Sequence, residues 1–503
     1  MQGCKDGSAY ITWFDLNAVL HIRRLDKDGF DIWAPDLVTF RDLGFNYAGS
    51  FIDSRENLYI CIDRKQPAIN GYEFVLLKVD KDGNKVFGEN GIVFQNPDRN
   101  DNMYIPRYSV NDQEDVFFSY FRTIGETSCR IIHRITKDGD LPWGVDGLVL
   151  TDYITPEIIV SRNDGFYLLV NKYIGVHHDD WRYEVYVRKY NLEGKPVWER
   201  DLMVYKGYME AWTRDFLTGD SGDFYMGWVP SWLQHVSADG STLWDGGGLD
   251  LISDSTAWGA APEFAGINSK GELLIYFCRY DNHYKNPQLY GQLIDKQGQR
   301  LWGDAGRPIP INDFSGQYAY MNDQYRLKMN NDTVFLFYPY PLPANPSHPY
   351  SLRAMAIDIE GKAVWPHSIE VAPERPYISL PAVTDFVDNQ AILLWSESSS
   401  TKKGILKAQN IRTDGSMGAK SVSSRTEAIS RKIQFSFNQD TRTIRFNGLT
   451  SDEQYTLHNS SGQSVSSGQA SQEIHLPELT QGIYVVTLMR GSTLVESFKV
   501  YIR

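Results

Sequence analysis

The chain of 503 residues is too long for one ordinary compact core unless that core is built from repeated units. A net charge of -13 at pH 7, with no basic stripe, excludes a general nucleic-acid binder. No run approaches the roughly 20 apolar residues of a membrane-spanning helix, and the 13% aromatic content of this turn-rich chain favours β structure.

A short motif recurs along the chain, as in VDKDGNKVFGENGIVF from Val79 and ITKDGDLPWGVDGLVL from Ile135. Its turn glycine recurs at a mean step of about 55 residues, and a fixed period of this length marks stacked supersecondary units. The eight turn glycines are Gly29, Gly83, Gly139, Gly194, Gly240, Gly298, Gly361 and Gly415. Four positions after the first seven glycines lies an aromatic residue, namely Trp33, Phe87, Trp143, Trp198, Trp244, Trp302 and Trp365.

Each repeat contains four strand-like runs, which in the second repeat cover 46–53, 57–62, 73–80 and 91–94. The DKDG segments predict tight hairpin turns, because Asp bonds its own backbone and Gly adopts the positive φ that closes the turn. Eight such units predict an all-β fold in which residues 1–422 form an eight-bladed β-propeller. We expect the recurring aromatic residue to pack between neighbouring blades; a row of sugar-binding Trp side chains is the alternative.

The first repeat begins with AYITW, which corresponds to the second strand of the later repeats. We therefore expect its first strand to lie upstream of this sequence. The opening residues MQGCKDGSAY contain no signal peptide, so we also expect one to be missing from the sequence.

The four cysteines, Cys4, Cys61, Cys129 and Cys278, include no pair at the spacing of zinc ligands. Cys61 and Cys278 lie in apolar strand-like runs, where we expect free, buried thiols. We expect neither a metal nor another cofactor.

The repeat ends near residue 422, and the polar segment 423–431 predicts a linker. Residues 432–503 contain about seven short runs with period-two alternation, which predicts a small Ig-like β-sandwich. An ordinary adhesive Ig-like domain is one interpretation of this module.

The C-terminal segment resembles the sorting domain of type IX secretion, also called the Por secretion system, in YTLHNSSGQSV, LPELTQGIYVVTL and the final FKVYIR. It lacks the Asn-Pro opening that is common in such domains. The preceding repeats resemble the propeller-like repeats with the pattern DxxGxxxWGxxG that are found ahead of them. The residues that match the sorting motif are Leu476, Leu479, Gly482, Tyr484 and Lys499.

The resemblance implies that the protein passes through the periplasm and the outer membrane of a Gram-negative bacterium by means of the type IX machinery. It further implies cleavage in the linker and then release or attachment at the cell surface. The family that the repeats resemble is better known by sequence than by activity, so the function has to come from the residues.

The search for catalytic motifs assigns no catalytic residue. The segment SADGSTLW (237–244) is similar to a sialidase Asp-box, but its glycine lies one place early, so we interpret it as the recurring hairpin turn. The polar cluster HHDDW (177–181) has adjacent residues that would point to opposite faces of a strand, which is poor spacing for metal ligands.

The loops between the second and third strands are long and varied, whereas the first-to-second turns are uniformly tight. Long aromatic loops on one face of a rigid scaffold are typical of binding sites, so we expect any ligand there. The candidate residues are His177, Asp180, Trp181, Trp232, Arg279, Tyr280, Asp281, His283, Tyr338 and Tyr340. We favour a binding protein for a glycan or a protein ligand; the alternative is a secreted hydrolase or lyase that acts on polysaccharide or peptide at the propeller mouth.

Overall fold

The computed structural model describes most of the chain. The residues outside the description are 16, 34–36, 42–45, 67–70, 96–102, 125–126, 152–154, 176–181, 209–212, 220–221, 229–230, 245–246, 253–256, 282–287, 312–324, 342–349, 376, 380, 400–401, 419–433, 440, 448, 450–452, 460–462, 491–492 and 503. The predicted linker 423–431 therefore lies outside it.

The described residues form 39 strands and no helix, which confirms the expected all-β class. The chain divides into two compact units, Met1–Ala419 and Lys420–Arg503. Each unit is built from small antiparallel sheets, and in the first unit each sheet consists of strands that are consecutive in the sequence.

The described residues of the first unit form eight sheets, numbered here in chain order. The first four sheets contain β1 (Gln2–Gly3), β2 (Ala9–Phe14), β3 (Leu20–Leu25), β4 (Val38–Phe40); β5 (Asn46–Ile52), β6 (Leu58–Gln66), β7 (Gly71–Val79), β8 (Ile92–Phe94); β9 (Met103–Val110), β10 (Val116–Ile124), β11 (Thr127–Ile135), β12 (Leu148–Leu150); and β13 (Thr155–Arg162), β14 (Gly165–Tyr173), β15 (Arg182–Asn191), β16 (Leu202–Tyr208). The last four contain β17 (Thr213–Thr218), β18 (Phe224–Trp228), β19 (Trp232–Val236), β20 (Leu249–Asp250); β21 (Ala257–Ile267), β22 (Leu273–Asp281), β23 (Gln288–Ile294), β24 (Arg307–Pro308); β25 (Arg326–Asn330), β26 (Thr333–Pro341), β27 (Tyr350–Asp358), β28 (Ile369–Arg375); and β29 (Tyr377–Ile378), β30 (Ala382–Val383), β31 (Gln390–Ser399), β32 (Lys402–Arg412).

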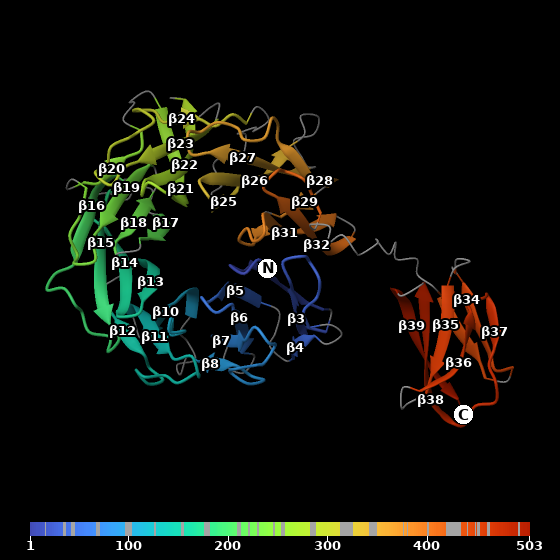
Figure 1. The fold of residues 1–503 in the computed structure, drawn as a ribbon. Coiled ribbons are helices and arrows are strands. Elements are labelled where there is room, and N and C mark those ends of the chain that lie inside the picture. Colours follow the sequence, from blue (N-terminus) through green and yellow to red (C-terminus); the bar gives the residue numbers. More distant parts are fainter. Residues whose placement is uncertain are drawn as a thin grey trace. The chain divides into compact units, whose positions relative to one another are not determined.

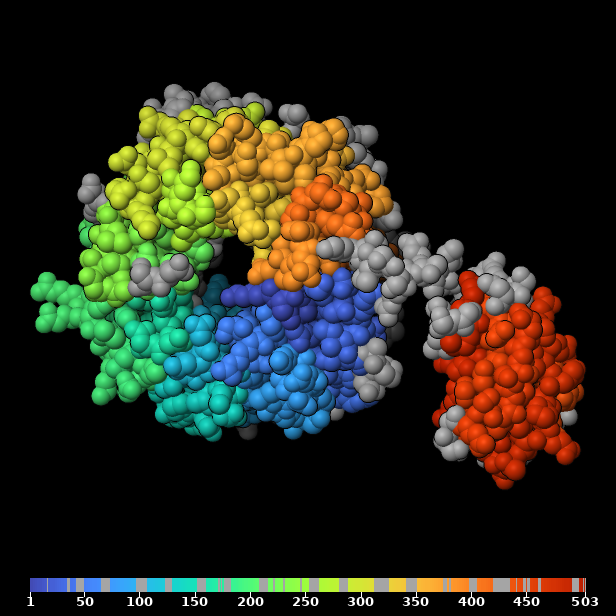
Figure 2. Space-filling view, viewed as in Figure 1, coloured from blue at the N-terminus to red at the C-terminus, as the bar shows by residue number. Residues whose placement is uncertain are grey.

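The eight sheets follow one another around a central opening, with strands such as β13, β17 and β25 on the inside (Figure 1). The space-filling view shows that side chains leave this opening clear in the direction of view (Figure 2). The hydrophobic cores lie between neighbouring sheets; Leu20 and Ile22 of the first sheet, for example, share a cluster with Leu58 and Ile60 of the second. Stability therefore comes from contacts between consecutive sheets.

The two ends of the ring differ from what the sequence predicts. The first sheet does have a first strand, since Gln2 and Gly3 pair with Tyr10 and Ala9, so the prediction that this strand is missing was wrong. With only two residues, β1 is too short to show an alternating pattern. In the eighth sheet the first strand is split into β29 and β30, which both pair with β31.

The predicted hairpin chemistry is present in the turns. In the second repeat, Oδ1 of Asp80 accepts hydrogen bonds from the backbone N–H groups of Asp82 and Asn84, at 3.0 and 2.8 Å. Gly83 closes the turn with a φ of 90°, a conformation that costs an L side chain free energy. The same turn recurs at the other seven positions because its chemistry is local.

The aromatic residue of one repeat lies against the turn glycine of the next. A Cβ built on Gly194 lies 3.4 Å from the Trp143 ring, and one built on Gly415 lies 3.2 Å from the Trp365 ring. The indole N–H of Trp143 donates to the Leu192 carbonyl at 3.0 Å. This confirms the predicted packing between neighbouring units, although the ring of Trp143 is only half-buried.

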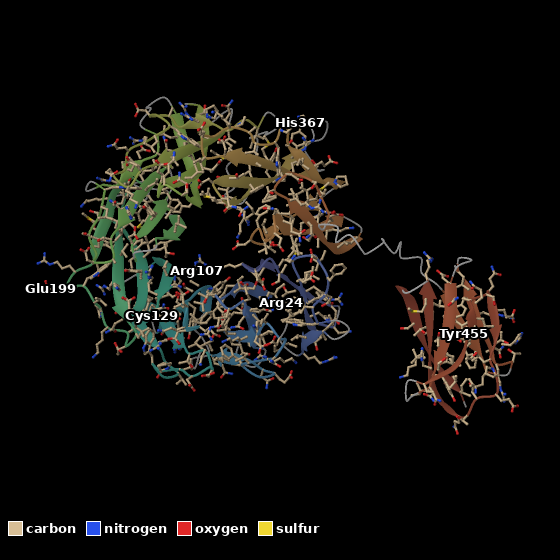
Figure 3. All side chains as sticks on the ribbon, viewed as in Figure 1. Arg24, Arg107, Cys129, Glu199, His367 and Tyr455 are labelled. Atoms are coloured by element: carbon tan, nitrogen blue, oxygen red, sulfur yellow. The ribbon has the colours of Figure 1, made fainter. Side chains whose placement is uncertain are left out.

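The second unit has its own hydrophobic core between two sheets. Its strands are β33 (Gln434–Asn438), β34 (Thr443–Asn447) and β37 (Glu473–His475) in one sheet, and β36 (Ser464–Gln469), β35 (Glu453–His458), β38 (Gly482–Arg490) and β39 (Thr493–Ile502) in the other. Side chains such as Tyr455, labelled in Figure 3, pack into this core. The sheets are antiparallel throughout.

Candidate functional site

A polar hollow of about 700 Å³ lies among the third, fourth and fifth sheets. It is lined by the ends of the first strands and by the hairpins that follow them, including Asn111, Arg162 and Gly219. Lys189, near the end of β15, also lines it. The hollow therefore lies on the face of the tight turns, opposite to the face where the sequence predicts a ligand.

The rim of the hollow is held by bonds between the third and fourth sheets. The hydroxyls of Ser109 and Ser161 are 2.8 Å apart, and Nδ2 of Asn111 donates to the carbonyl of Arg162 at 3.1 Å. The Asn163 side chain bridges to Asp112, whose backbone N–H donates to Asn163 Oδ1 at 3.1 Å. These bonds fix two hairpins relative to each other, so the polar groups are positioned before any ligand arrives.

The carboxylate of Asp164 pairs with the ammonium of Lys189 at 2.6 Å. Partial burial raises the pKa of Asp164, but the hydrogen bond and the charge of Lys189 outweigh it and bring this pKa below its ordinary value. Lys189 is itself mostly buried and lies 5.5 Å from the centre of the Tyr167 ring. The Asp164 carboxylate therefore stays ionised at neutral pH.

Lys189 departs from the pattern that the preceding repeats set. In the first three repeats, the basic residue five positions before the turn glycine bonds a carbonyl in the next turn: Arg24 reaches Lys81, Lys78 reaches Lys137, and Arg134 reaches Leu192. In the fourth repeat this position is Lys189, whose ammonium bonds Asp164 of its own sheet, as Arg134 bonds Asp115, but makes no described bond to the equivalent Ala238 carbonyl. The hollow is located where this bond between sheets is missing from the described structure.

Arg162 supplies positive charge to the hollow. Its side chain is partly exposed, and its Nη2 lies 3.1 Å from a Cβ built on Gly222, so a side chain at that position would crowd the guanidinium. Its positive charge also acts on nearby Asp164, where it helps to lower the pKa of the carboxyl. A guanidinium in this setting can donate hydrogen bonds to a carboxylate or to hydroxyl groups.

The sequence missed these residues because they belong to tight hairpins, which we interpreted as purely structural. One signal was available: RNDG at 162–165 places Arg, Asn and Asp together in a single turn. The repeat alignment alone does not show that Lys189 turns toward this hairpin.

Four of the ten candidate residues on the predicted ligand face lie outside the description. These are His177, Asp180, Trp181 and His283, whereas Tyr280 and Asp281 are described only as part of β22. Of the remainder, Tyr338 is fully buried, and a ring with no exposed surface cannot bind a ligand. Its assignment to a ligand site was therefore wrong, because its place in β26 faces the core.

Three predicted residues are described and partly exposed. Trp232 packs against Tyr205 with ring centres 5.3 Å apart, and the Arg279 guanidinium lies 5.1 Å from the centre of a tyrosine ring. Tyr340 is covered by Arg353, whose Cζ lies 4.2 Å from the ring centre. They belong to the fifth, sixth and seventh sheets, so the structure spreads them along one face, and their role in binding stays a prediction.

The sorting-motif residues in the second unit divide into core and surface positions. Leu476 and Tyr484 are buried, and Leu479 packs against the same cluster. The hydroxyl of Tyr484 donates to the Thr480 carbonyl at 2.9 Å and ties the PELTQG segment to β38. Gly482 begins β38, and Lys499 is exposed on β39.

Comparisons with known proteins assign no family. No family model and no curated protein matches the chain. Among solved structures it is similar to puromycin hydrolase, at 12% identity over 78% of this chain and 57% of that one, with a TM-score of 0.40. It is also similar to prolyl oligopeptidase B from Galerina marginata, at 13% identity over 89% and 55%, with a TM-score of 0.41. The chain thus spans just over half the length of either enzyme, and such a likeness transfers no activity to it.

A protein of unknown function from Dyadobacter fermentans matches at 10% identity, over 63% of this chain and 95% of that one, with a TM-score of 0.33. Within the described residues, no helix has the length and apolar character needed to cross a membrane.

Proposed function

We propose that residues 1–422 form an eight-bladed β-propeller that binds a polar ligand, foremost a glycan, without catalysis. Eight sheets in chain order around a central opening support the propeller (Figure 1). The polar hollow at the third, fourth and fifth sheets supports a binding role, because ligand sites are concave and carry a few positioned polar groups.

The observation that carries the binding role is the pairing of the polar groups inside the hollow. Asp164 is held by Lys189, and Asp112 is bonded to Asn163. A hydrolase that uses two carboxylates needs one that keeps its proton near neutral pH. Asp164 has a lowered pKa, so it is suited to orient a ligand and not to act as a general acid.

The chemistry of the hollow favours a ligand with a carboxylate and hydroxyl groups. The guanidinium of Arg162 matches a carboxylate with two parallel hydrogen bonds. The hydroxyls of Ser109 and Ser161 and the amide of Asn163 supply both donors and acceptors at the rim. Acidic oligosaccharides have this combination of groups.

A glycan array with the purified full chain tests the proposal. We expect binding to acidic glycans, with at least a tenfold loss in Arg162→Met, because the charge-assisted hydrogen bonds disappear. Arg200→Met is the matched control, since Arg200 is exposed in the same repeat but does not line the hollow. Equal binding by the parent and Arg162→Met, together with loss in Trp232→Ala, would instead place the site on the long-loop face.

We further propose that the second unit is a β-sandwich that acts as a type IX sorting domain, so that the protein is secreted or held at the outer cell surface. Its two sheets around a separate core support an independent module. The Leu and Tyr residues of the motif pack in the core, whereas Lys499 is exposed. The motif therefore contributes both to folding and to a charge that a partner can reach.

A further inference from the structure

Three potential metal ligands meet at the seam between the first and second sheets. The Sγ atom of Cys4, a carboxylate oxygen of Asp6 and a carboxylate oxygen of Glu56 all lie within 4.8 Å of one another. Cys4 and Asp6 belong to the turn between β1 and β2, whereas Glu56 belongs to the hairpin between β5 and β6. The sheet packing therefore brings together residues that lie 50 positions apart in the sequence.

Glu56 gives an independent indication that this place holds a ligand. Its side chain is 9% exposed, and its Oε2 atom is buried without a hydrogen-bond partner in the described structure. The other oxygen, Oε1, accepts the backbone N–H of Lys5 at 3.1 Å. A buried carboxylate oxygen without a partner is costly, and a bound cation removes that cost.

The neighbours of Asp6 leave room for a cation. One carboxylate oxygen accepts bonds from the backbone N–H and the hydroxyl of Ser8, at 2.8 and 2.5 Å, and the other accepts Nη2 of Arg24 at 2.8 Å. Two oxygens carry about four lone-pair sites, so at least one stays available. Arg24 and Ser8 then orient this ligand, as outer partners do in metal sites.

Charge and ligand type select the metal. A thiolate, two carboxylates and the Arg24 guanidinium carry a formal charge of about −2, which a divalent cation neutralises. Calcium and magnesium take oxygen ligands alone, whereas zinc accepts sulfur and oxygen together in tetrahedral sites. We propose that Cys4, Asp6 and Glu56 bind a zinc ion at this seam, with a water molecule as the fourth ligand.

The site is next to the place where the ring closes. The carbonyl oxygen of Cys4 accepts the backbone N–H of Asp385, in the eighth sheet, at 3.0 Å. A zinc ion on Cys4 therefore connects the second sheet to a residue that is also bonded to the last sheet. Zinc binds the folded ring better than the unfolded chain, so it raises the stability of the first unit.

The test uses the full chain, stripped of metal with a chelator and then titrated with Zn²⁺ or Co²⁺. We expect one metal equivalent per chain, a thiolate-to-cobalt absorption band in the near ultraviolet, and a higher Tm of the first unit when zinc is added. Cys4→Ser should abolish the band and weaken zinc binding by at least tenfold, on the order seen when metal-site contacts are lost.

Cys278→Ser is the matched control, because Cys278 is also buried but lies outside the cluster. It should keep the absorption band and the zinc-dependent rise in Tm. If Cys4→Ser fails to fold, Glu56→Gln takes its place, since it keeps the shape of the side chain and removes its charge. Absence of stoichiometric zinc binding, or a cobalt band that persists in Cys4→Ser, would overturn the proposal.

Discussion

The side-chain amide of Asn410 donates a hydrogen bond of 2.9 Å to the carbonyl oxygen of Lys27, and it joins the eighth sheet of the first unit to the first. At other seams an indole N–H bonds the carbonyl two positions before the turn glycine, as Trp365 does with Thr413 at 3.0 Å. The eighth repeat has Ala419 in place of the aromatic residue. Asn410 occupies the repeat position of Arg24, five residues before the turn glycine, and it bonds at ring closure the equivalent of the carbonyl that Arg24 and Trp33 both bond at the first seam.

We expect Asn410→Ala to lower the free energy of unfolding of the first unit by about 1–2 kcal/mol, because a buried amide–carbonyl bond is lost. The Lys27 carbonyl keeps the bond from Gln390 at 3.2 Å, which limits the loss. Denaturant unfolding measures the change, and Asn84→Ala, in an exposed turn, is the control that should change little. If Asn84→Ala lowers the free energy of unfolding as much as Asn410→Ala does, ring closure does not depend on the Asn410–Lys27 bond.

Trp365→Ala should destabilise the first unit by about 3–5 kcal/mol, because a large side chain that is 4% exposed leaves a cavity between two sheets. Trp365→Phe should cost about 1 kcal/mol, since it keeps most of the packing but loses the bond to Thr413. Trp33→Ala should cost less than Trp365→Ala because Trp33 is only half-buried. Chemical denaturation of the three variants checks this order, and equal costs at both tryptophans would contradict it.

Gly147 and Gly144 provide a matched pair in one turn. Both have positive φ, at 65° and 74°, but a Cβ on Gly147 would lie 2.6 Å from the Ile132 carbonyl oxygen, whereas one on Gly144 meets nothing within 4 Å. Gly144→Ala should cost about 1–2 kcal/mol of backbone strain. Gly147→Ala should cost more, because a clash with the backbone is added, and thermal unfolding of the pair measures the difference.

His133 should make the first unit sensitive to acid. Burial lowers its pKa to about 4, and the nearby Asp146 carboxylate opposes this only in part. As the pH falls, His133 is protonated near pH ~6.5 in the unfolded state but only near pH 4 in the folded state. The free energy of unfolding is therefore highest above this range and decreases as the pH falls through it, by up to about 3 kcal/mol.

The pH dependence of the free energy of unfolding, measured in His133→Gln, checks this expectation. In His133→Gln, the free energy of unfolding should fall much less between pH ~6.5 and 4 than in the parent, even if the variant is less stable at every pH. His367→Gln, at the exposed histidine labelled in Figure 3, should keep the parent's slope. An unchanged slope in His133→Gln would assign the acid sensitivity to other groups.

Removal of residues 432–503 should abolish appearance at the cell surface in a bacterium that has type IX secretion. Lys499→Ala tests the motif without disturbing the core, because this side chain is exposed, and Glu478→Gln at another exposed position is the control. Mass spectrometry of the exported parent should place its mature C-terminus within or near 423–434. Undiminished surface display of the truncated chain would argue decisively against the sorting role.

The local features of the repeats were predictable from the sequence. Asp80 and Gly83 form their turn through bonds within five residues, so the chemistry of the DKDG segment is enough to specify it. The period of about 55 residues and the aromatic position indicated that Trp143 meets the next unit, because a repeated unit can bury its apolar face only against a copy of itself.

Contacts between repeats were decided by the tertiary structure alone. Phe87 has no N–H group, and it is Lys78 that reaches the Lys137 carbonyl at that seam. Lys189 pairs with Asp164 of its own sheet, as Arg134 pairs with Asp115, but unlike Arg134 it makes no described bond to a carbonyl in the next turn. The direction of a long side chain depends on which partners the neighbouring sheet offers, and a single sequence does not show those partners.

Two features near the start of the chain also depend on contacts that the sequence does not show. The two-residue strand Gln2–Gly3 forms because β2 offers it a free edge, and a pair of residues has no periodicity that could predict it. Two hairpins that pack side by side bring together Cys4, Asp6 and Glu56. A search for metal-ligand spacing along the sequence therefore cannot find this cluster. Turn and strand chemistry acts between near neighbours in sequence. The seams, the hollow and the Cys4–Asp6–Glu56 cluster arise instead where sheets about 50 residues apart in the sequence pack together.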